Sequence, residues 1–368
     1  MNIKIAHCAD IHLNCNSDEE YELFMDMLKI CKENNVSFLL IAGDLFDDVN
    51  IPESKYRWVK EALKYFRVKT IISPGNHDPF TPDSPYSDNS WPENVFIFKT
   101  NQMSCFFFPD FNLKIWGSAF TGIYQKKSLF NFKDGVDESF INICVMHGTL
   151  VDYSRGISYY NPVLSTSIEK SNMDYVALGH IHKRSEILNF GKTFYSYCGC
   201  LSGKSFKETG DKGIYIGELS KNYCDMNFYK VSKKSYEKIS VDISNCTTNN
   251  GVIEHALKEI KSFKGENFDK NYYHITFIGS LDEDFVLDTG YINSVLNKHL
   301  LFVKSEDNTE VKIDTQKLKL RKDFKSIFIK KAIAMIEESQ NEEEKAINEM
   351  ALKLGLKAFT EDVGYNDN

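Results

Sequence analysis

Short apolar runs that end directly in aspartate, asparagine or histidine are the feature that most constrains the fold of this chain. The clearest run is Ser37–Ala42, which is continuously apolar apart from its first residue and is followed by Gly43 and Asp44. A run of this kind is typical of a strand buried on both faces of a sheet. Amphipathic helices are expected on either side of it, over 18–34 and 54–66. This alternation predicts a layered α/β domain.

The pattern changes along the chain and indicates three parts. Residues 1–232 carry the strand–helix alternation and are predicted to form the catalytic domain. Residues 233–308 are predicted to form a small α+β module. Residues 309–368 are predicted to be a helical segment. The elements expected in the last two parts are strands at 236–243 and 272–278 and helices at 252–263, 288–299, 324–338 and 342–359.

Composition excludes some classes of protein. No apolar run reaches the roughly 18–20 residues that span a bilayer, and the N-terminus reads as a strand rather than a signal peptide, so we expect a cytoplasmic protein without a membrane anchor. The nine cysteines form no CxxC pair and are expected to be reduced thiols. The net charge of −8 argues against a non-specific nucleic-acid binder. It does not decide the matter, because a carboxylate-rich metal site adds negative charge that bound cations offset.

Five polar motifs follow predicted strands and are rich in residue types that bind metals. They are Asp10-Ile11-His12, Gly43-Asp44-Leu45-Phe46-Asp47, Gly75-Asn76-His77-Asp78, His147-Gly148 and Gly179-His180-Ile181-His182. In extended chain, residues two apart point the same way, so the carboxylate and imidazole of the first motif can converge on one ion.

Any one of these residues could instead be a buried structural histidine, a turn residue or a helix cap. Five such motifs after five strands are hard to explain by packing alone. Imidazole, carboxylate and amide ligands together suit manganese, iron or zinc better than magnesium or calcium. Two such ions roughly 4 Å apart can hold a phosphoryl group. The sequence therefore predicts a two-metal phosphoesterase.

The ordered motifs DIH, GDLFD, GNHD, HG and GHIH resemble the calcineurin-like metallophosphoesterases, and most of all the DNA repair exonucleases of the SbcD and YhaO type. Residues 79–95, 197–200 and 205–213 are similar to further segments of that subgroup. The likeness covers about residues 1–220 and is weak beyond them. It implies a layered β-sandwich flanked by helices, followed by a small α+β capping domain that shapes DNA access.

The resemblance also implies roles for individual residues. One metal would be held by Asp10, His12, Asp44 and His182, and the second by Asp44, Asn76, His147 and His180, with manganese as the expected ion. His77 would contact the scissile phosphate without binding a metal. Asp47 is expected to form a hydrogen bond with His77, the alternative being a solvent-facing turn residue.

One departure from a neighbouring class is informative. Serine/threonine protein phosphatases carry an arginine and a glutamate where this chain has Asp48 and Asp78. The arginine that clamps phosphate in those enzymes is missing, which argues against a phosphoprotein phosphatase.

Several side chains are candidates for contacts with DNA, although each could equally be a solvated surface group. The basic candidates are Arg155, Lys183, Arg184, Lys204 and Lys207. Tyrosines 153, 159 and 160, in the loop after His147, could stack on bases.

Three hypotheses for function remain open: a DNA exo- or endonuclease acting in repair with an SMC-like ATPase, a phosphodiesterase or phosphatase for a small nucleotide, and a binding scaffold with a weak site. The extra module favours the first. The apolar positions of the C-terminal helices recur at helical spacing. These helices are expected to dock on the ATPase, as in the nucleases that the chain resembles. Alternatively, they pack on the catalytic domain or on each other. The sequence leaves the oligomeric state open, a homodimer included.

Overall fold

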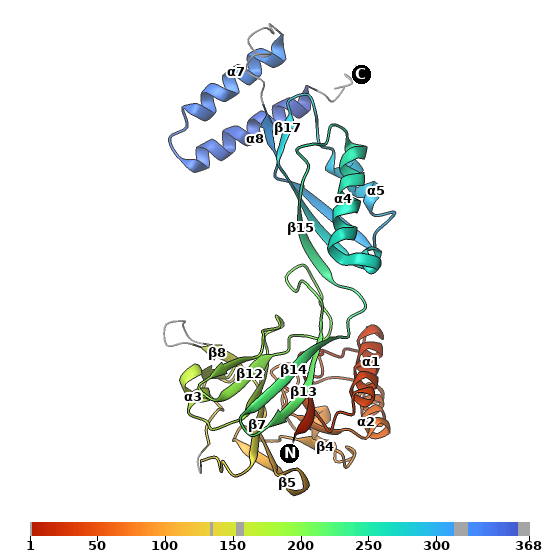
Figure 1. Cartoon of the computed structure of the whole chain (residues 1–368), viewed down its shortest axis with the longest axis vertical. Helices are drawn as coiled ribbons and strands as arrows, with labels where there is room; N and C mark the ends of the chain where they lie inside the picture. The colour runs from red at the N-terminus through yellow and green to blue at the C-terminus, as the bar shows by residue number, and fades with distance from the viewer. Residues whose placement is uncertain (1, 133–134, 152–157, 313–322, 360–368) are drawn as a thin grey trace. The chain divides into compact units, whose positions relative to one another are not determined.

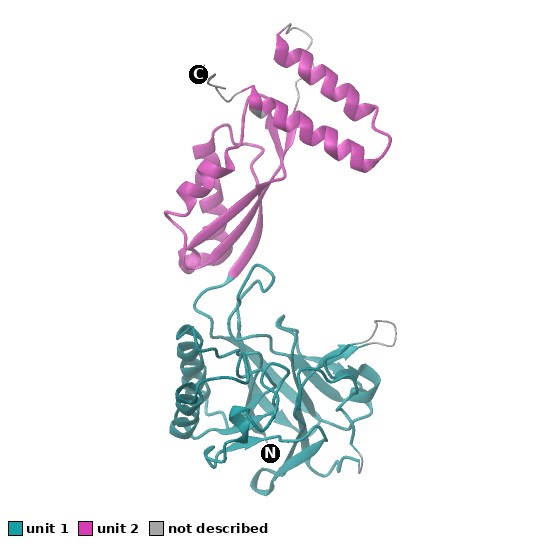
Figure 2. Ribbon diagram, turned by 180° about the vertical axis from the view of Figure 1, so that it is seen from behind, with its two compact units in different colours: residues 1–235 teal, residues 236–368 magenta. Residues whose placement is uncertain are grey.

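The computed structural model describes residues 2–132, 135–151, 158–312 and 323–359. The chain divides into two compact units, residues 1–235 and residues 236–368, coloured separately in Figure 2. Each unit has its own hydrophobic core.

Unit 1 is built on two six-stranded sheets. The first has the order β14-β13-β1-β2-β3-β4 and the second the order β11-β12-β10-β7-β6-β5. The strands of the first sheet are β1 (Ile3–Cys8), β2 (Phe38–Ile41), β3 (Lys69–Ile72), β4 (Val95–Ile97), β13 (Gly213–Ser220) and β14 (Tyr223–Lys230). Those of the second are β5 (Ser104–Phe108), β6 (Leu113–Gly117), β7 (Ile141–His147), β10 (Tyr175–Gly179), β11 (Leu188–Phe190) and β12 (Thr193–Tyr197).

Alternation along β1 explains how the layers pack. Ile3 and Ile5 belong to a core that contains side chains of both sheets, whereas Ala6 and Cys8 belong to a second core formed with the helices. The helices α1 (Glu19–Glu33) and α2 (Glu53–Phe66) contribute to this second core and lie together along one side of unit 1 (Figure 1). The short helix α3 (Ser165–Glu169) contributes to a third core, on the other sheet. The result is the layered β-sandwich flanked by helices that the sequence predicts.

Strand direction gives the sandwich one functional edge. β1, β2 and β3 run parallel in the first sheet, and β6, β7 and β10 run parallel in the second. Carboxyl ends of parallel strands meet at one edge of a sheet, which is where open α/β sheets place their ligands. A small pair of parallel strands, β8 (Thr149–Val151) and β9 (Pro162–Leu164), follows β7.

Unit 2 contains a three-stranded parallel sheet of order β15-β16-β18 with two helices packed on it. A two-stranded parallel pair, β17 and β19, and a pair of helices, α7 and α8, complete the unit. The elements are β15 (Tyr236–Asp242), α4 (Asn249–Lys264), β16 (Tyr272–Ile278), β17 (Ser280–Asp282), α5 (Thr289–Leu296), β18 (Phe302–Asp307), β19 (Glu310–Lys312), α7 (Phe324–Glu337) and α8 (Glu342–Ala358). In the described part of the chain, no helix is both long enough and apolar enough to cross a membrane.

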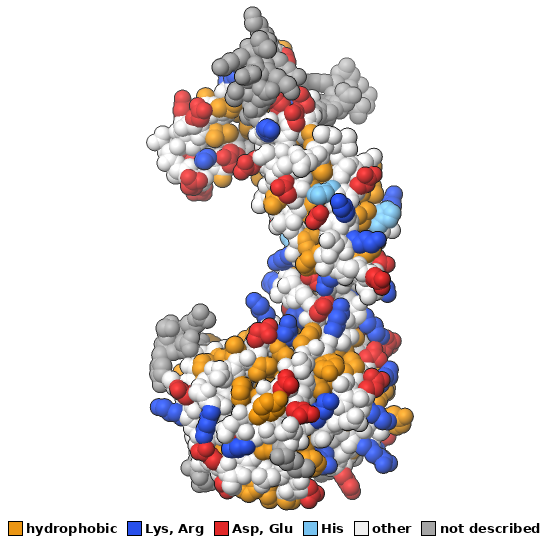
Figure 3. Space-filling view, viewed as in Figure 1, with side chains coloured by type: hydrophobic (Ala, Val, Ile, Leu, Met, Phe, Trp, Pro, Cys, Tyr) orange, Lys and Arg blue, Asp and Glu red, His pale blue; other side chains and the backbone are white. Residues whose placement is uncertain are grey.

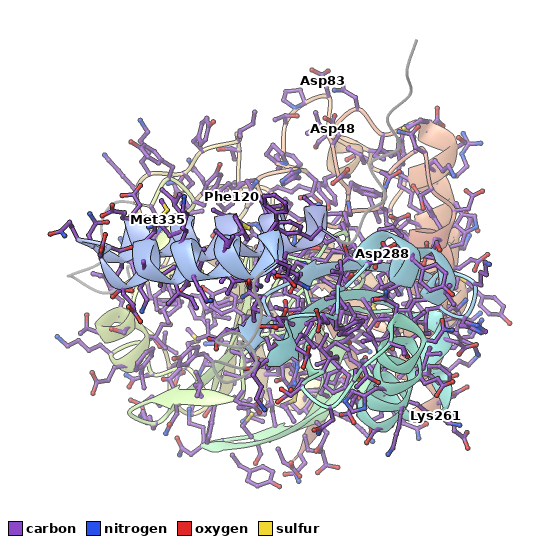
Figure 4. All side chains as sticks on the ribbon, turned by 90° about the horizontal axis from the view of Figure 1, so that it is seen from above. Asp48, Asp83, Phe120, Lys261, Asp288 and Met335 are labelled. Carbon is purple, nitrogen blue, oxygen red and sulfur yellow. The ribbon has the colours of Figure 1, made fainter. Side chains whose placement is uncertain are left out.

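The helices α7 and α8 pack against each other through one apolar face. Ile329 and Ala332 of α7 are buried with Leu352 and Leu356 of α8, and Val311 adjoins this small core. Figure 4 labels Met335, an exposed side chain of α7 outside this core. The prediction that these helices pack on each other is therefore confirmed for one face of each, and the opposite face is considered below.

The expected helices are present to within a few residues, but several strands were not foreseen from the sequence. β14 and β18 carry charged or polar side chains at alternate exposed positions and therefore lack a continuous apolar run. β4, β11 and β17 have only three residues each, too short to show a period.

Candidate metal centre

All seven residues predicted to bind metal lie just beyond, or at the end of, five parallel strands. Asp10 and His12 follow β1, Asp44 follows β2 and Asn76 follows β3. The other three come from the second sheet, because His147 ends β7 and His180 and His182 follow β10. The structure brings these side chains together at one edge of the sandwich, as five segments far apart in the sequence.

The backbone of these loops is unusual. Asp10, His12, Asp44 and His180 all have positive φ, at 49°, 52°, 50° and 94°. Non-glycine residues rarely adopt this left-handed conformation, and strained residues of this kind cluster at functional sites. Backbone bonds hold two of the loops together, since the amides of Ile11 and His12 both donate to the Asp44 carbonyl.

Two glycines make room for the predicted ligands. A Cβ on Gly43 would lie 2.3 Å from Nδ1 of His147, and one on Gly75 would lie 2.1 Å from Oδ1 of Asp44. Gly43 also has φ of +92°. No other residue fits at either position without displacing a ligand.

The first predicted ligand set is closely spaced. Nε2 of His12 lies 3.2 Å from Nε2 of His182, which is 3.8 Å from Oδ1 of Asp10. Oδ2 of Asp44 is 3.9 Å from Nε2 of His12. Asp10 also accepts hydrogen bonds from the backbone amide of His180, which fixes its orientation.

The second set meets the first at Asp44. The same oxygen, Oδ2 of Asp44, lies 3.3 Å from Nε2 of His147. Oδ1 of Asn76 lies 2.9 Å from Nε2 of His147 and 3.2 Å from Nδ1 of His180. Asp44 is thus the side chain shared by both sets, in the position of a bridging ligand.

Hydrogen bonds to the far nitrogen select the tautomer of two of these histidines. Nδ1 of His147 lies 3.0 Å from the Ala42 carbonyl, and Nδ1 of His182 lies 2.5 Å from the Glu208 carboxylate. Both partners only accept hydrogen bonds, so Nδ1 carries a proton and the lone pair of Nε2 is left for the centre. Histidine ligands of metals are typically oriented in this way by a carbonyl or carboxylate.

The electrostatics of the cluster match a site for cations. Asp10 and Asp44 are almost completely buried, and two buried carboxylates repel each other unless positive charge lies between them. Burial raises the pKa of Asp10. Burial also opposes ionisation of Asp44, but His147 and His12 outweigh it and hold the pKa of Asp44 below its usual range. Burial by itself lowers the pKa of His147, but the nearby Asp44 carboxylate outweighs burial and raises this pKa to about 9.

His77 and Asp47 lie beside the cluster, and the predicted contact between their side chains is wrong. The hydrogen bond joins Nδ1 of His77 to the backbone carbonyl of Asp47, over 3.1 Å, rather than to the Asp47 carboxylate. The Asp47 carboxylate instead lies 3.0 Å from Nδ1 of His12 and 3.5 Å from Nζ of Lys204. The neighbouring His12 holds the pKa of Asp47 at about 2. The amide of Asp47 donates to the Leu13 carbonyl over 3.0 Å, which holds Asp47 against the loop after β1, next to His12.

The basic residues predicted to contact DNA differ in their surroundings. Arg155 lies outside the described residues. Lys183, Lys204 and Lys207 are exposed, and Lys204 borders the cluster through Asp47. The Arg184 guanidinium lies over the Phe228 ring and donates to the Tyr215 hydroxyl, so it helps to pack unit 1. On the face drawn in Figure 3, the basic side chains of unit 1 are interspersed with acidic ones.

Three supporting residues were missed by sequence reasoning. Glu208 orients His182, as described above. Asp78 is buried and accepts hydrogen bonds from the backbone amides of Phe46 and Gly75, and burial raises its pKa to about 7. Asn161 is buried and donates to the His147 carbonyl. Asp78 directly follows His77 in the sequence, and Glu208 lies in the segment 205–213 that resembles the repair-nuclease subgroup. Nothing in the sequence marks Asn161 as a neighbour of the cluster.

The chemistry of the donors fits a pair of divalent cations. Groups of three acidic, histidine or cysteine ligand atoms, all within 4.8 Å of one another, include Asp10 with His12 and His182, and Asp10 with Asp44 and His147. Two further groups join His182 and Glu208 to Cys200, and His77 to His12 and Asp44. Mixed nitrogen and oxygen donors of this kind suit first-row transition metals.

Comparison with known proteins places this cluster in a family. Residues 3–184 match the family model described as Calcineurin-like phosphoesterase. The chain is 28% identical over 269 residues to the "Uncharacterized metallophosphoesterase YhaO" of Bacillus subtilis, over 66% of this chain and 64% of that protein. This chain therefore spans slightly less than two thirds of YhaO.

Two further relatives have names that point to different substrates. The chain is 26% identical over 278 residues to the "DNA double-strand break repair protein Mre11" of Methanococcus maripaludis, over 66% of this chain and 68% of that protein. It is 26% identical over 210 residues to a "Probable cyclic nucleotide phosphodiesterase" of Coxiella burnetii, over 53% of this chain and 81% of that protein. Residues 3–184 of this chain belong to the calcineurin-like phosphoesterase family, a family of metal-dependent phosphoesterases with a dinuclear metal centre.

Proposed function

We propose that this chain is a two-metal phosphodiesterase that cleaves DNA, with Asp44 bridging two manganese ions. The observation that carries the proposal is the meeting of both ligand sets at Oδ2 of Asp44, 3.9 Å from Nε2 of His12 and 3.3 Å from Nε2 of His147. Two divalent cations held there would supply Lewis acidity to a phosphoryl group. Asp10, His12 and His182 would complete one site, and Asn76, His147 and His180 the other.

His77 is the proposed proton donor to the leaving oxygen. Its backbone amide donates to Oδ1 of Asp44 over 3.0 Å, which ties its position to the centre, while its side chain is exposed. Its Nδ1 donates to the Asp47 carbonyl, so proton exchange with a substrate takes place at Nε2. His77 thus serves as a positioned general acid that binds no metal. Asp47 supports it through its backbone and pairs its carboxylate with His12.

DNA is favoured as substrate by the likeness to the Mre11 repair protein and by unit 2, which a minimal small-molecule phosphodiesterase does not need. Lys183, Lys204 and Lys207 are exposed after the last ligand loop and could meet phosphates. A role in repair with an SMC-like ATPase belongs to the same proposal.

The C-terminal helices are the proposed contact with that ATPase. Ile347, Met350 and Leu354 are exposed on α8, and their spacing of three and four residues puts them on one face. Leu352 and Leu356, on the opposite face, pack against α7. A helix that is apolar on two faces can bury one in its own hairpin and offer the other to a partner helix.

The decisive experiment is hydrolysis by the purified full chain with manganese. Single- and double-stranded DNA and a cyclic mononucleotide are compared by kcat/KM, with the Asp44→Ala variant as the inactive control. DNA should be the better substrate. A cyclic nucleotide that is better by a wide margin would replace this proposal with the second candidate, a small-nucleotide phosphodiesterase, which the Coxiella relative favours.

A further inference from the structure

Two segments of unit 1 that are separate in the sequence join beside the metal centre. The amide of Gln125 donates to the Tyr159 carbonyl over 2.8 Å, and the amide of Asn161 donates to the Gln125 carbonyl over 2.7 Å. The turn that contains Tyr124 is thereby fixed to the strand-like segment that leads into β9. Sequence reasoning singled out Tyr159 and Tyr160 but had no reason to connect Tyr124 with them.

Both segments are anchored to predicted metal ligands. The Asn161 side chain donates to the His147 carbonyl over 2.7 Å and accepts from the Leu129 amide over 2.7 Å. The Tyr160 ring lies against the His180 ring, with centroids 4.7 Å apart and planes inclined by 33°. A group resting on these segments is therefore held at a fixed place relative to the centre.

An aromatic cluster extends outward from Tyr160. The Tyr124 ring is 5.8 Å from the Tyr160 ring and 6.4 Å from the Tyr159 ring. Nζ of Lys126 lies 5.1 Å from the centroid of the Tyr159 ring. Tyr124 and Tyr159 remain 63% and 49% exposed. Rings that served only to fill a core would be buried, because burial is what makes aromatic packing favourable.

We propose that Tyr124, Tyr159 and Lys126 form a stacking platform for the nucleobase beside the scissile phosphate. The proposal rests on the proposed function, since it names what the same site recognises next to the phosphodiester. Exposed aromatic faces stack on any base and so select nucleotides without reading sequence. The Lys126 ammonium adds a point charge for a flanking phosphate. Tyr160 is the inner member of the cluster and sets the distance between platform and centre.

The test uses two oligonucleotides that differ only in the base. One is a single-stranded oligonucleotide with a full set of bases, and the other has abasic residues at the end that is cleaved. The full chain with manganese is assayed as wild type, Tyr124→Ala, Tyr159→Ala and Tyr124→Phe. Tyr65→Ala is the matched control, because Tyr65 is 71% exposed on α2 and belongs to the helix layer. Tyr160 is left intact because it touches His180.

Loss of one stacking ring should lower kcat/KM for the intact oligonucleotide by about 5- to 100-fold in Tyr124→Ala. The abasic oligonucleotide should be cleaved equally by this variant and the wild type. Tyr124→Phe, which keeps the ring, should retain the wild-type preference, and Tyr65→Ala should change nothing. Quenching of 2-aminopurine at the terminal position, measured in EDTA, should weaken in the Tyr124→Ala variant in the same way.

Two results would overturn the platform: no change in Tyr124→Ala, or an equal fall on both oligonucleotides, which would mean general damage to the site. Failure of the proposed function looks different. In that case the wild type cleaves neither oligonucleotide although it hydrolyses bis(p-nitrophenyl) phosphate.

Discussion

The phosphoesterase edge of unit 1 and the α7–α8 pair of unit 2 depart from ordinary packing in opposite ways. The edge buries polar groups, with Asp10, Asp44 and His147 almost completely inaccessible. The helical pair exposes apolar groups, with Ile347, Met350 and Leu354 in solvent. A chain optimised for stability alone would do neither, because unpaired buried charge is costly and apolar surface stabilises only when buried.

The two departures point to different kinds of ligand. Buried carboxylates facing histidine nitrogens call for a cation, which is small and enters the fold. An exposed apolar stripe calls for a macromolecular surface, because a helix face is covered by packing against another helix or sheet. Changes at the edge should therefore act on metal and chemistry, and changes on the stripe should act on association alone.

The largest effect is expected from Asp44→Ala, because this carboxylate is shared by both ligand sets. Hydrolysis should fall below detection and both ions should be lost or weakened together, as measured by elemental analysis and by assay of the purified chain. Asp48→Ala is the matched control, because Asp48 is an exposed residue of the same loop (Figure 4). Two ions bound as tightly in Asp44→Ala as in the wild type would rule out the bridge.

His77→Ser should separate chemistry from metal binding at the same edge. Its side chain is exposed and its Nδ1 is engaged with the Asp47 carbonyl. We expect unchanged metal content and a kcat about 10²-fold lower or more, the range for a positioned general acid. If the variant lost metal instead, His77 would have to be counted among the ligands.

Glu208→Gln should weaken one ion selectively. The carboxylate lies 2.5 Å from Nδ1 of His182 and raises the pKa of that histidine, while the pKa of Glu208 itself falls to about 2. Loss of such a partner typically costs 10- to 100-fold in metal affinity. Manganese titration should show one weakened site and one unchanged site. Glu186→Gln, an exposed carboxylate, is the control, and equal affinities in both variants would leave Glu208 without a positioning role.

Met350→Asp on α8 should weaken association with the proposed SMC-like ATPase partner and leave hydrolysis of a short oligonucleotide unchanged. The side chain is exposed and outside the α7–α8 core, so the fold should tolerate the charge. A loss of at least about tenfold in affinity is expected for a central apolar contact, measured by pull-down or calorimetry. Phe263→Asp, an equally exposed apolar position on α4, is the control. Undiminished binding by Met350→Asp would place the interface elsewhere.

The sequence predicted the edge of unit 1 well because its chemistry is local. Asp10 and His12 are separated by a single residue, and each motif directly follows an apolar strand, so position in the chain already implies position at the sheet edge. The same runs predicted a layered α/β domain, and the family resemblance implied that its layers form a sandwich. The strand β14 was missed because half of its residues face solvent and alternate with half-buried ones.

Contacts made across the fold were not accessible in this way. Glu208 lies 26 residues from its partner His182, and Asn161 lies 14 residues from His147. Neither spacing is one at which a single strand or helix would bring two side chains into contact. The carboxylate of Asp47 was assigned to the wrong histidine for the same reason. His77 and His12 come from two different loops beside Asp47, and the choice between them depends on the direction of the Asp47 side chain. The sequence showed that the exposed face of α8 is apolar. It did not show which of the two apolar faces of α8 packs against α7.

The smallest effect concerns a buried histidine between the sheets. His7 is completely buried, its Nδ1 lies 2.9 Å from the Tyr175 hydroxyl, and burial lowers its pKa to about 3. The unfolded chain binds a proton at His7 below about pH 6.5, whereas the folded chain stays neutral until pH falls to about 3. The contribution of His7 to stability is therefore complete above pH 6.5 and declines as pH falls, by about 1.4 kcal/mol for each pH unit. His7→Gln removes this proton, so its free energy of unfolding should fall less steeply than that of the wild type between pH 6 and pH 4.

Urea unfolding in EDTA, followed by tryptophan fluorescence, measures unit 1 specifically, because Trp58, Trp91 and Trp116 all lie there. His299→Gln, an exposed position of unit 2, should leave this unfolding transition unchanged. Parallel pH curves for the wild type and His7→Gln would mean that His7 has the same pKa in the folded chain as in the unfolded chain, and the space between the sheets would then hold a buried charge below pH 6.5.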